Sequence, residues 1–217
     1  VLALRLEEIS PALYYQVTDK DELQTHLDTI RGRYTDLIAG IRGLTDATVL
    51  VWNFPDPVYP ASGIGERSLK WTQLDVIHDI NRVLAGLCST FPDVHVFDVH
   101  RVAGEVGLAR WSDAKLLHTG RIPHGAEAQL QIGRALSRYL NAICNPPCKC
   151  LAVDLDNTIW GGAVGEDGLG GILLGEDYPG NVYKDFQRHL LMLRDRGILL
   201  AIASKNNPED VAEVFDR

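Results

Sequence analysis

The segment CLAVDLD, at residues 150–156, constrains the fold of this chain more than any other. Its first four residues are apolar, which is typical of a strand buried on both faces of a parallel sheet. Two acids, Asp154 and Asp156, follow where the strand is expected to end. Because ligands bind in the crevice at the carboxyl ends of such strands, the segment predicts an α/β sheet with an acidic site at its edge.

Helix and strand patterns alternate along the rest of the chain. Apolar residues at spacings of three and four predict helices over residues 21–41, 69–88, 126–143 and 183–197. Strands are predicted at ATVLVWNF, VHVFDVH and ILLAIAS, and a last helix is predicted to begin at Pro208. The alternation favours a mainly parallel α/β architecture.

A linker is expected at ICNPPCK, residues 143–149, because consecutive prolines cannot continue the helix before them. The chain is therefore predicted to hold two domains, residues 1–143 and residues 148–217.

Composition narrows the classes of function. The chain has 217 residues, 46% of them hydrophobic, and a formal net charge of -8. It lacks the basic excess typical of proteins that bind nucleic acid or anionic membranes nonspecifically, so neither partner is expected. No apolar run approaches the roughly 18 residues of a transmembrane helix, and the start does not resemble a signal peptide. A cytoplasmic location is expected, and because the sequence does not begin with Met we expect a piece of a longer protein.

Four cysteines occur, and three of them crowd into CNPPCKC at positions 144, 148 and 150. Disulfides are not expected in a reducing cytoplasm. The C-x3-C-x-C spacing has no downstream Cys or His pair, so a structural zinc site is less favoured than small buried residues near the start of a strand.

Asp154 and Asp156 have two possible roles. Residues i and i+2 of an extended segment share a face, so the two carboxylates would repel each other unless a cation compensates them. With Mg²⁺ bound, one acid could attack phosphorus while the other handles the proton of the leaving oxygen. The alternative is a solvated D-x-D turn.

The sequence around these two acids resembles the motifs of a known family. VDLDNTIWGG is similar to the first motif, h-h-h-D-x-D-x-T, of the haloacid dehalogenase (HAD) superfamily, and ILLAIASK is similar to the second, with Ser204 lying 50 residues after Asp154. The string DLDNTIWGGAVGEDG, with ASKN and the preceding α/β region, resembles the FkbH-like branch. The resemblance implies a HAD-like Rossmannoid parallel sheet, incomplete at the C-terminus, preceded by an SGNH-like α/β domain.

This resemblance also implies a function, that of a magnesium-dependent glyceryl transferase and phosphatase. Such enzymes load a glyceryl unit from 1,3-bisphosphoglycerate, a phosphorylated three-carbon substrate, onto an acyl carrier protein in polyketide-type biosynthesis. Asp154 is implied as nucleophile and Mg²⁺ ligand, and Asp156 as the general acid/base whose backbone carbonyl also meets the metal. Thr158 would steady the loop, Ser204 would donate to phosphoryl oxygens, and Lys205 is a further candidate for phosphate. A third-motif Lys and a fourth-motif acid pair are expected beyond residue 217.

The Gly-rich stretch at residues 160–180 is too short for a large cap domain and is expected to form a small hairpin flap over the site. Its acids are Glu166, Asp167, Glu176 and Asp177. For these acids a solvated flap surface is favoured over metal binding.

A glyceryl thioester would need a thiolate, and Cys150 is one candidate. Four residues of strand separate it from Asp154, which is about 13 Å, so the thiol is expected toward the opposite edge of the sheet. A packed core cysteine is the favoured alternative.

The first 140 residues resemble SGNH-type esterases in pattern, and Asn53, Asp113 and His118 are the kinds of residue that such hydrolases use. The Asp-to-His interval is five rather than the usual three, and no Gly-Asp-Ser nucleophile segment precedes the pair. A capping aspartate and a loop histidine are favoured instead, with this half assigned to partner docking or substrate shielding.

An acidic carrier protein would need a basic patch on this acidic chain. The candidate residues, on one predicted helix, are Lys184, Arg188, Arg194 and Arg196. A solvated face balanced by Asp185 and Asp195 is an equal alternative.

Three functions stay open from the sequence. The first is the glyceryl transferase and phosphatase that acts with a carrier protein. The second is a small-molecule phosphatase of the same superfamily that needs no carrier. The third, from another class, is a noncatalytic docking or scaffold protein. The sequence makes no prediction of the oligomeric state.

Overall fold

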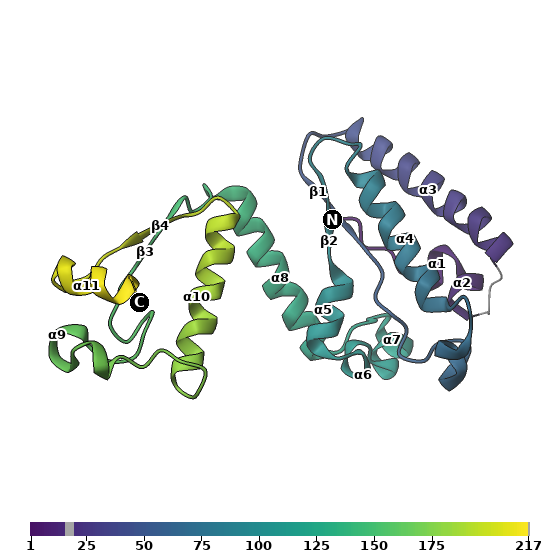
Figure 1. Cartoon of the computed structure of the whole chain (residues 1–217). Coiled ribbons are helices and arrows are strands. Elements are labelled where there is room, and N and C mark those ends of the chain that lie inside the picture. Colours follow the sequence, from purple (N-terminus) through teal and green to yellow (C-terminus); the bar gives the residue numbers. More distant parts are fainter. Residues whose placement is uncertain (16–19, 217) are drawn as a thin grey trace. The chain divides into compact units, whose positions relative to one another are not determined.

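Two pairs of parallel strands organise the structure, one pair in each half of the chain (Figure 1). The computed structural model describes residues 1–15 and 20–216. The chain divides into two units, unit 1 at residues 1–141 and unit 2 at residues 142–217. Each strand and helix predicted from the sequence is present, and the mainly parallel α/β architecture is confirmed.

Unit 1 surrounds strands β1 (Val49–Trp52) and β2 (Val94–Phe97) with helices. Its helices are α1 (Leu6–Ile9), α2 (Pro11–Tyr15), α3 (Lys20–Arg42), α4 (Gln73–Cys88), α5 (Val99–Val106), α6 (Leu108–Trp111), α7 (Ala114–Gly120) and α8 (Ala126–Cys144), with a 3-10 turn η1 (Gly63–Ser68) before α4. The end of α8 extends into unit 2.

Strand β1 is buried on both faces. Alternate residues of a strand point to opposite faces. Val49 and Val51 pack in a core built with α3 and α4, whereas Leu50 packs in a second core with α5 and α8. Leu2 also pairs with β1, since its N–H donates to Leu50 O at 2.8 Å and its carbonyl accepts from Trp52 N at 3.0 Å. Helices therefore cover this small sheet on both sides, as the apolar composition of β1 predicts.

Helix α4 begins at Gln73, later than the sequence pattern suggested. The residue before it, Thr72, forms a capping box: Thr72 Oγ1 accepts from Asp75 N at 3.1 Å, and the Asp75 carboxylate accepts from Thr72 N at 3.0 Å. Residues 69–71 therefore lie outside the helix, although Leu69 fits the apolar period. A cap of this kind satisfies donors that the first helical turn leaves unpaired.

Unit 2 holds strands β3 (Cys150–Val153) and β4 (Leu199–Ile202). Its further elements are α9 (Val164–Asp167), the 3-10 turn η2 (Leu169–Gly171), α10 (Gly180–Asp195) and α11 (Pro208–Phe215). As predicted, Gly197 follows the end of α10 with φ +92°, and Pro208 begins α11. In the part of the chain that the structure describes, we find no helix that could serve as a membrane span.

The expectation that β3 is buried on both faces is wrong. Leu151 and Val153 pack against the core of unit 2, but Cys150 and Ala152, on the other face, are exposed. In β4, Ile202 is 57% exposed. The reason is that the sheet of the described residues has only two strands, so the unit's core instead gathers beneath the loop after β3 around Leu155, Ile159, Trp160, Val164 and Leu190.

Replacing Ile80 by Ala should destabilise unit 1 by about 2–5 kcal/mol, because Ile80 is fully buried between α4 and its neighbours and the change leaves a cavity. Urea denaturation followed by circular dichroism measures the loss. Leu44 is 89% exposed, so the control Leu44→Ala should change the free energy of unfolding by less than about 0.5 kcal/mol. Equal effects of the two changes would contradict the assigned core.

Candidate functional site

The carboxyl ends of β3 and β4 meet at one edge of the sheet. The strands are parallel, with Val153 opposite Ile202, and Ala203 N donates to Val153 O at 3.0 Å to extend the pairing by one residue. Asp154 therefore leaves the sheet at the same edge as Ser204. This is the crevice position at which open parallel sheets bind ligands.

Asp154 is exposed and lies directly after β3. Its Oδ1 accepts a hydrogen bond from Leu155 N at 2.8 Å, which fixes the carboxylate close to the main chain. The ion pairs in the described part of unit 2 use Lys184, Arg188 and Arg194, and Asp154 is not among their partners. Its negative charge is thus left for solvent or for a cation.

Asp156 faces a different environment from Asp154. Its Oδ1 accepts from the indole Nε1 of Trp160 at 3.0 Å and from Val164 N at 3.3 Å. Partial burial by itself raises the pKa of Asp156, but the nearby Asn206 amide, the indole and the Val164 N–H outweigh it and lower the pKa below its ordinary value. These hydrogen bonds therefore favour the ionised form of Asp156.

The two acids do not share a regular strand. Strand β3 ends at Val153, and the chain turns so that Leu155 is fully buried between the acids. The rule that residues i and i+2 share a face applies to extended backbone, so it does not set the directions of these two side chains. Their different hydrogen bonds do so instead.

Thr158 lies in the turn that follows the acids. Its N–H and that of Ile159 both donate to Leu155 O, at 3.1 and 2.9 Å. Asn157 has φ +53°, in the left-handed region that asparagine tolerates, and its Oδ1 accepts from Gly162 N at 3.0 Å. The turn is a tight hydrogen-bonded structure in which Thr158 is one member.

Buried residues hold this turn against the rest of unit 2. Trp160 is 1% exposed and its ring contacts Phe215 of α11 edge to face, at 5.9 Å between centroids. Gln187 of α10 donates to Ile159 O at 2.7 Å. The position of the Asp156 carboxylate therefore depends on packing with α10 and α11.

Ser204 and Lys205 follow β4. Ser204 is partly buried and its Oγ accepts from Asn206 N at 3.2 Å, whereas Lys205 is exposed. Asn206 Nδ2 is buried and makes no hydrogen bond of standard geometry within the described chain. The second strand end thus brings a hydroxyl and an amide to the edge that carries the acids.

The Gly-rich stretch at residues 160–180 does not form the expected hairpin. It contains the short helix α9 and the turn η2, and it closes on itself by one antiparallel bridge between Gly161 and Leu173. A Cβ on Gly161 would lie 2.9 Å from Leu173 Cβ and 2.9 Å from a ring carbon of Tyr183, so the close approach requires glycine. Asp167 accepts from Ala163 N at 3.0 Å, a structural role inside the loop.

Cys150 lies at the start of β3, while Asp154 follows its end, so the predicted separation holds along the strand. The favoured alternative of a packed core cysteine is wrong, because Cys144, Cys148 and Cys150 are all exposed and only Cys88 of the four is buried. The reason is the open outer face of β3.

Asp113 caps a helix in unit 1, as the favoured alternative predicted. It precedes α7, and its Oδ1 accepts from Leu116 N at 3.0 Å. His118 is exposed in the last turn of that helix rather than in a loop. Asn53 follows β1, where its amide donates to Asp98 at 2.8 Å and its oxygen accepts from His100 N at 2.9 Å.

The basic residues of α10 have acidic partners. Arg188 pairs with Asp185 at 2.5 Å, and Lys184 pairs with Glu176, whose pKa is lowered by the Lys184 hydrogen bond and charge. These ion pairs favour a solvated helix face, on which acids balance the basic residues, over an open basic patch. Docking of a carrier protein on α10 stays a prediction.

The sequence reasoning missed one group of side chains. Asp56, His78 and His100 lie together in unit 1, with their ligand atoms within 4.8 Å of one another. Asp56 follows β1 and His100 follows β2, so the strand-end argument that located Asp154 would have found two of the three. His78 comes from the middle of α4 and had no signal in the sequence.

A solved structure resembles this chain along most of its length. No protein-family model matches the chain, and no curated protein matches it. The chain is similar to the crystal structure of the N-terminal part of the protein BF1531 from Bacteroides fragilis, which contains a phosphatase domain and is complexed with Mg. The likeness has a TM-score of 0.70 with 24% identity, and it covers 93% of this chain and 53% of the other. This chain thus spans about half the length of that one and shares its fold.

Replacing Trp160 by Phe should raise the pKa of Asp156 toward its ordinary value, because the indole donor is lost while a ring stays in the core. Carboxylate titration by NMR measures the change. Trp111→Phe, a buried tryptophan of unit 1, is the control and should leave that titration unchanged.

The hydrogen bond from the Trp160 indole to Asp156 also predicts that the free energy of unfolding of unit 2 depends on pH. Because the folded pKa of Asp156 is depressed, its stabilisation is fully present above the unfolded value of about 3.9 and is lost as pH falls through the folded pKa. Trp160→Phe should weaken that loss in acid denaturation of unit 2. Identical acid profiles would show that the indole does not set the pKa.

Proposed function

We propose that the chain carries the first part of a magnesium-dependent phosphatase site of the HAD type, with Asp154 as nucleophile. The observation that carries the proposal is the placement of Asp154 and Ser204 at the shared carboxyl edge of β3 and β4. The shared fold with a chain described as containing a phosphatase domain complexed with Mg supports it. So does the sequence resemblance around Asp154.

The residues at this edge fit magnesium by their chemistry. Mg²⁺ prefers hard oxygen ligands and is usually held by one or two carboxylates together with water and substrate phosphates. Asp154 supplies an exposed carboxylate outside the ion pairs of unit 2. The backbone carbonyl of Asp156 is the second ligand that the resemblance implies. A bound Mg²⁺ would neutralise charge on the phosphoryl group and the acids together.

The chemistry of the chain's own residues then divides into two steps. In the first, a carboxylate oxygen of Asp154 forms a bond to phosphorus while the bond from phosphorus to the leaving oxygen breaks, and Asp156 as general acid gives the leaving oxygen its proton. In the second, water displaces the Asp154 oxygen and loses its proton. Asp156, left ionised by the first step, takes that proton as general base, which restores its acid form for the next turnover. The Ser204 hydroxyl is assigned to donate a hydrogen bond to a phosphoryl oxygen. Lys205 is assigned to bind phosphate, and Thr158 is assigned to steady the loop that carries the acids.

The finer proposal is that the phosphorylated substrate has three carbons and that its glyceryl unit passes from 1,3-bisphosphoglycerate to an acyl carrier protein. The FkbH-like resemblance of residues 148–217 supports this substrate and partner. Cys150 as the thioester residue has little support, since it lies at the far end of β3 from Asp154.

Asp154→Asn should reduce magnesium-dependent release of phosphate from small phosphate esters by at least about 1000-fold, since the nucleophile is lost. The assay uses the full-length protein, and loss of activity on adding a chelator tests the metal. Glu166→Gln, an exposed acid of the same loop, is the matched control and should keep activity.

Two outcomes would overturn this assignment. Full activity of Asp154→Asn would show that the nucleophile lies elsewhere. A folded wild-type protein with no magnesium-dependent activity on any phosphate ester would favour the noncatalytic scaffold.

Intact-mass analysis tests the finer proposal. After incubation with the full-length protein, Mg²⁺ and 1,3-bisphosphoglycerate, the carrier protein should gain the mass of one glyceryl unit. Reversing charges with Lys184→Glu and Arg188→Glu should reduce the rate of loading about tenfold if α10 docks the carrier, because rim charges govern association. Arg134→Glu, on α8 of unit 1, is the control.

Two other results of the carrier-loading assay would contradict parts of the finer proposal. Phosphate release without any mass gain would support the plain phosphatase. Unchanged loading by the reversed α10 would remove that helix from the docking surface.

A further inference from the structure

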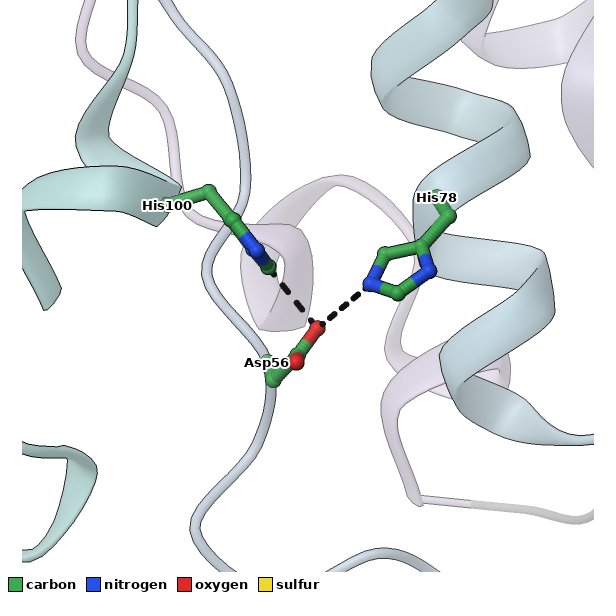
Figure 2. Close-up of side chains that lie close together, drawn as sticks. All are labelled: Asp56, His78 and His100. Atoms are coloured by element: carbon green, nitrogen blue, oxygen red, sulfur yellow. Dashed lines mark hydrogen bonds and ion pairs between the residues drawn. The ribbon is translucent and has the colours of Figure 1, made fainter. Parts of the chain in front are cut away.

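Asp56, His78 and His100 form a second group of possible metal ligands, in unit 1. They come from three segments: the loop after β1, the middle of α4 and the first turn of α5. Figure 2 shows both imidazole rings directed toward the Asp56 carboxylate, one from each side. Three segments far apart in sequence thus place their polar side chains at one point.

Two of the three distances between these atoms are close to those around a tetrahedral metal ion, and the third, between the two histidine nitrogens, is within 4.8 Å. His78 Nε2 lies 3.2 Å and His100 Nδ1 lies 3.6 Å from Asp56 Oδ1. Metal bonds of about 2.0–2.1 Å at tetrahedral angles place neighbouring ligand atoms about 3.4 Å apart. The two observed distances lie on either side of that value.

His100 Nδ1 needs a partner that the described chain does not supply. The atom is buried and makes no hydrogen bond within the described residues, because the Asp56 oxygen at 3.6 Å is too far away. A buried polar atom without a partner is costly and calls for an explanation. An ion between the two rings and the carboxylate would provide one.

Hydrogen bonds hold the three segments in place. Asn81, one turn after His78 on α4, donates to Phe54 O and accepts from Phe54 N, both at 2.8 Å, and so ties the loop of Asp56 to the helix. Asn53 accepts from His100 N at 2.9 Å and ties the same loop to α5. Preorganised ligands of this kind bind a metal without a large rearrangement.

The donor set selects the class of metal. Imidazole nitrogens suit Zn²⁺ and other transition metals, whereas Mg²⁺ prefers oxygen ligands. Two His and one carboxylate are a known ligand set of catalytic zinc, which keeps one position open. The side chains are partly exposed, at 24% for Asp56, 45% for His78 and 37% for His100, so water or a substrate oxygen can reach that position.

We propose that Asp56, His78 and His100 bind one divalent transition-metal ion of the Zn²⁺ class, with a fourth position open to solvent. This site lies in unit 1 and uses none of the residues assigned to phosphate chemistry in unit 2. It therefore gives unit 1 a role of its own beyond docking or shielding.

Calorimetric titration of the metal-free full-length protein with Zn²⁺ tests the proposal. The parent for all variants is Cys144→Ser, Cys148→Ser and Cys150→Ser, because these exposed thiols are competing zinc ligands. The parent should bind one Zn²⁺, with no competition from millimolar Mg²⁺. His78→Gln and His100→Gln should each weaken binding at least tenfold, since each removes a ligand.

Two controls separate this site from other histidines and from unit 2. His118→Gln removes an exposed histidine of α7 and should leave zinc affinity unchanged. Asp154→Asn should also leave it unchanged, so failure of the phosphatase proposal and failure of this one are distinguishable. Thermal unfolding of each variant without metal checks that it is folded.

Absence of saturable zinc binding by the parent would overturn the proposal, with the Asp56 to His78 contact then an ordinary hydrogen bond. Zinc affinity of folded His78→Gln and His100→Gln equal to that of the parent would overturn it too, by locating the ion elsewhere.

Discussion

Parallel pairing of short strands is the constraint on which both candidate sites depend. When two strands run in the same direction, their carboxyl ends meet, and whatever follows each strand is brought to a common edge. In unit 2 that edge receives Asp154 from β3 and Ser204 from β4. In unit 1 the same rule brings Asp56 and His100 together after β1 and β2.

The hydrogen-bonded turn after β3 gives the two acids different properties. Asp154 is exposed, whereas Asp156 accepts from Trp160 and Val164 and has a lowered pKa. Two neighbouring carboxylates in different environments can take different roles, one as nucleophile and one as base. The distinction depends on the Asn206 amide and on Trp160, which is buried in the core of unit 2, so core packing and the properties of these acids are linked there.

Periodicity and turn chemistry were sufficient to predict the main elements. The apolar period located α3 and α10, and Gly197 and Pro208 marked helix ends, because these signals are local. Burial of β3 was predicted wrongly, since the number of strands beside it is not a local property. The start of α4 was also misplaced, because the capping pair of Thr72 and Asp75 outweighs an apolar period that continues past it.

The same distinction, between features set by local sequence and features set by tertiary packing, applies to the residues of the two candidate sites. The placement of Asp154 and Ser204 at one edge of the sheet could be predicted because each follows an obvious strand, and their role in a site stays a prediction. His78 could not, because it lies on a helix and reaches the cluster only through the packing of α4 beside the loop of Asp56. The exposure of Cys150 also depended on tertiary structure, as its apolar neighbours in the sequence suggested a core position.

The chain connection between β3 and β4 implies an order of assembly for unit 2. Residues 154–198 separate the two strands, so their pairing must close a long loop, at an entropic cost that grows with the logarithm of its length. The turn from Asp154 to Val164, in contrast, is held by contacts close in sequence and can form first. Pairings of high sequence separation are late and slow. The hydrogen bonds of that turn would thus form before Ser204 arrives, whereas the packing of Trp160 against α11 and the edge shared by β3 and β4 would be completed last.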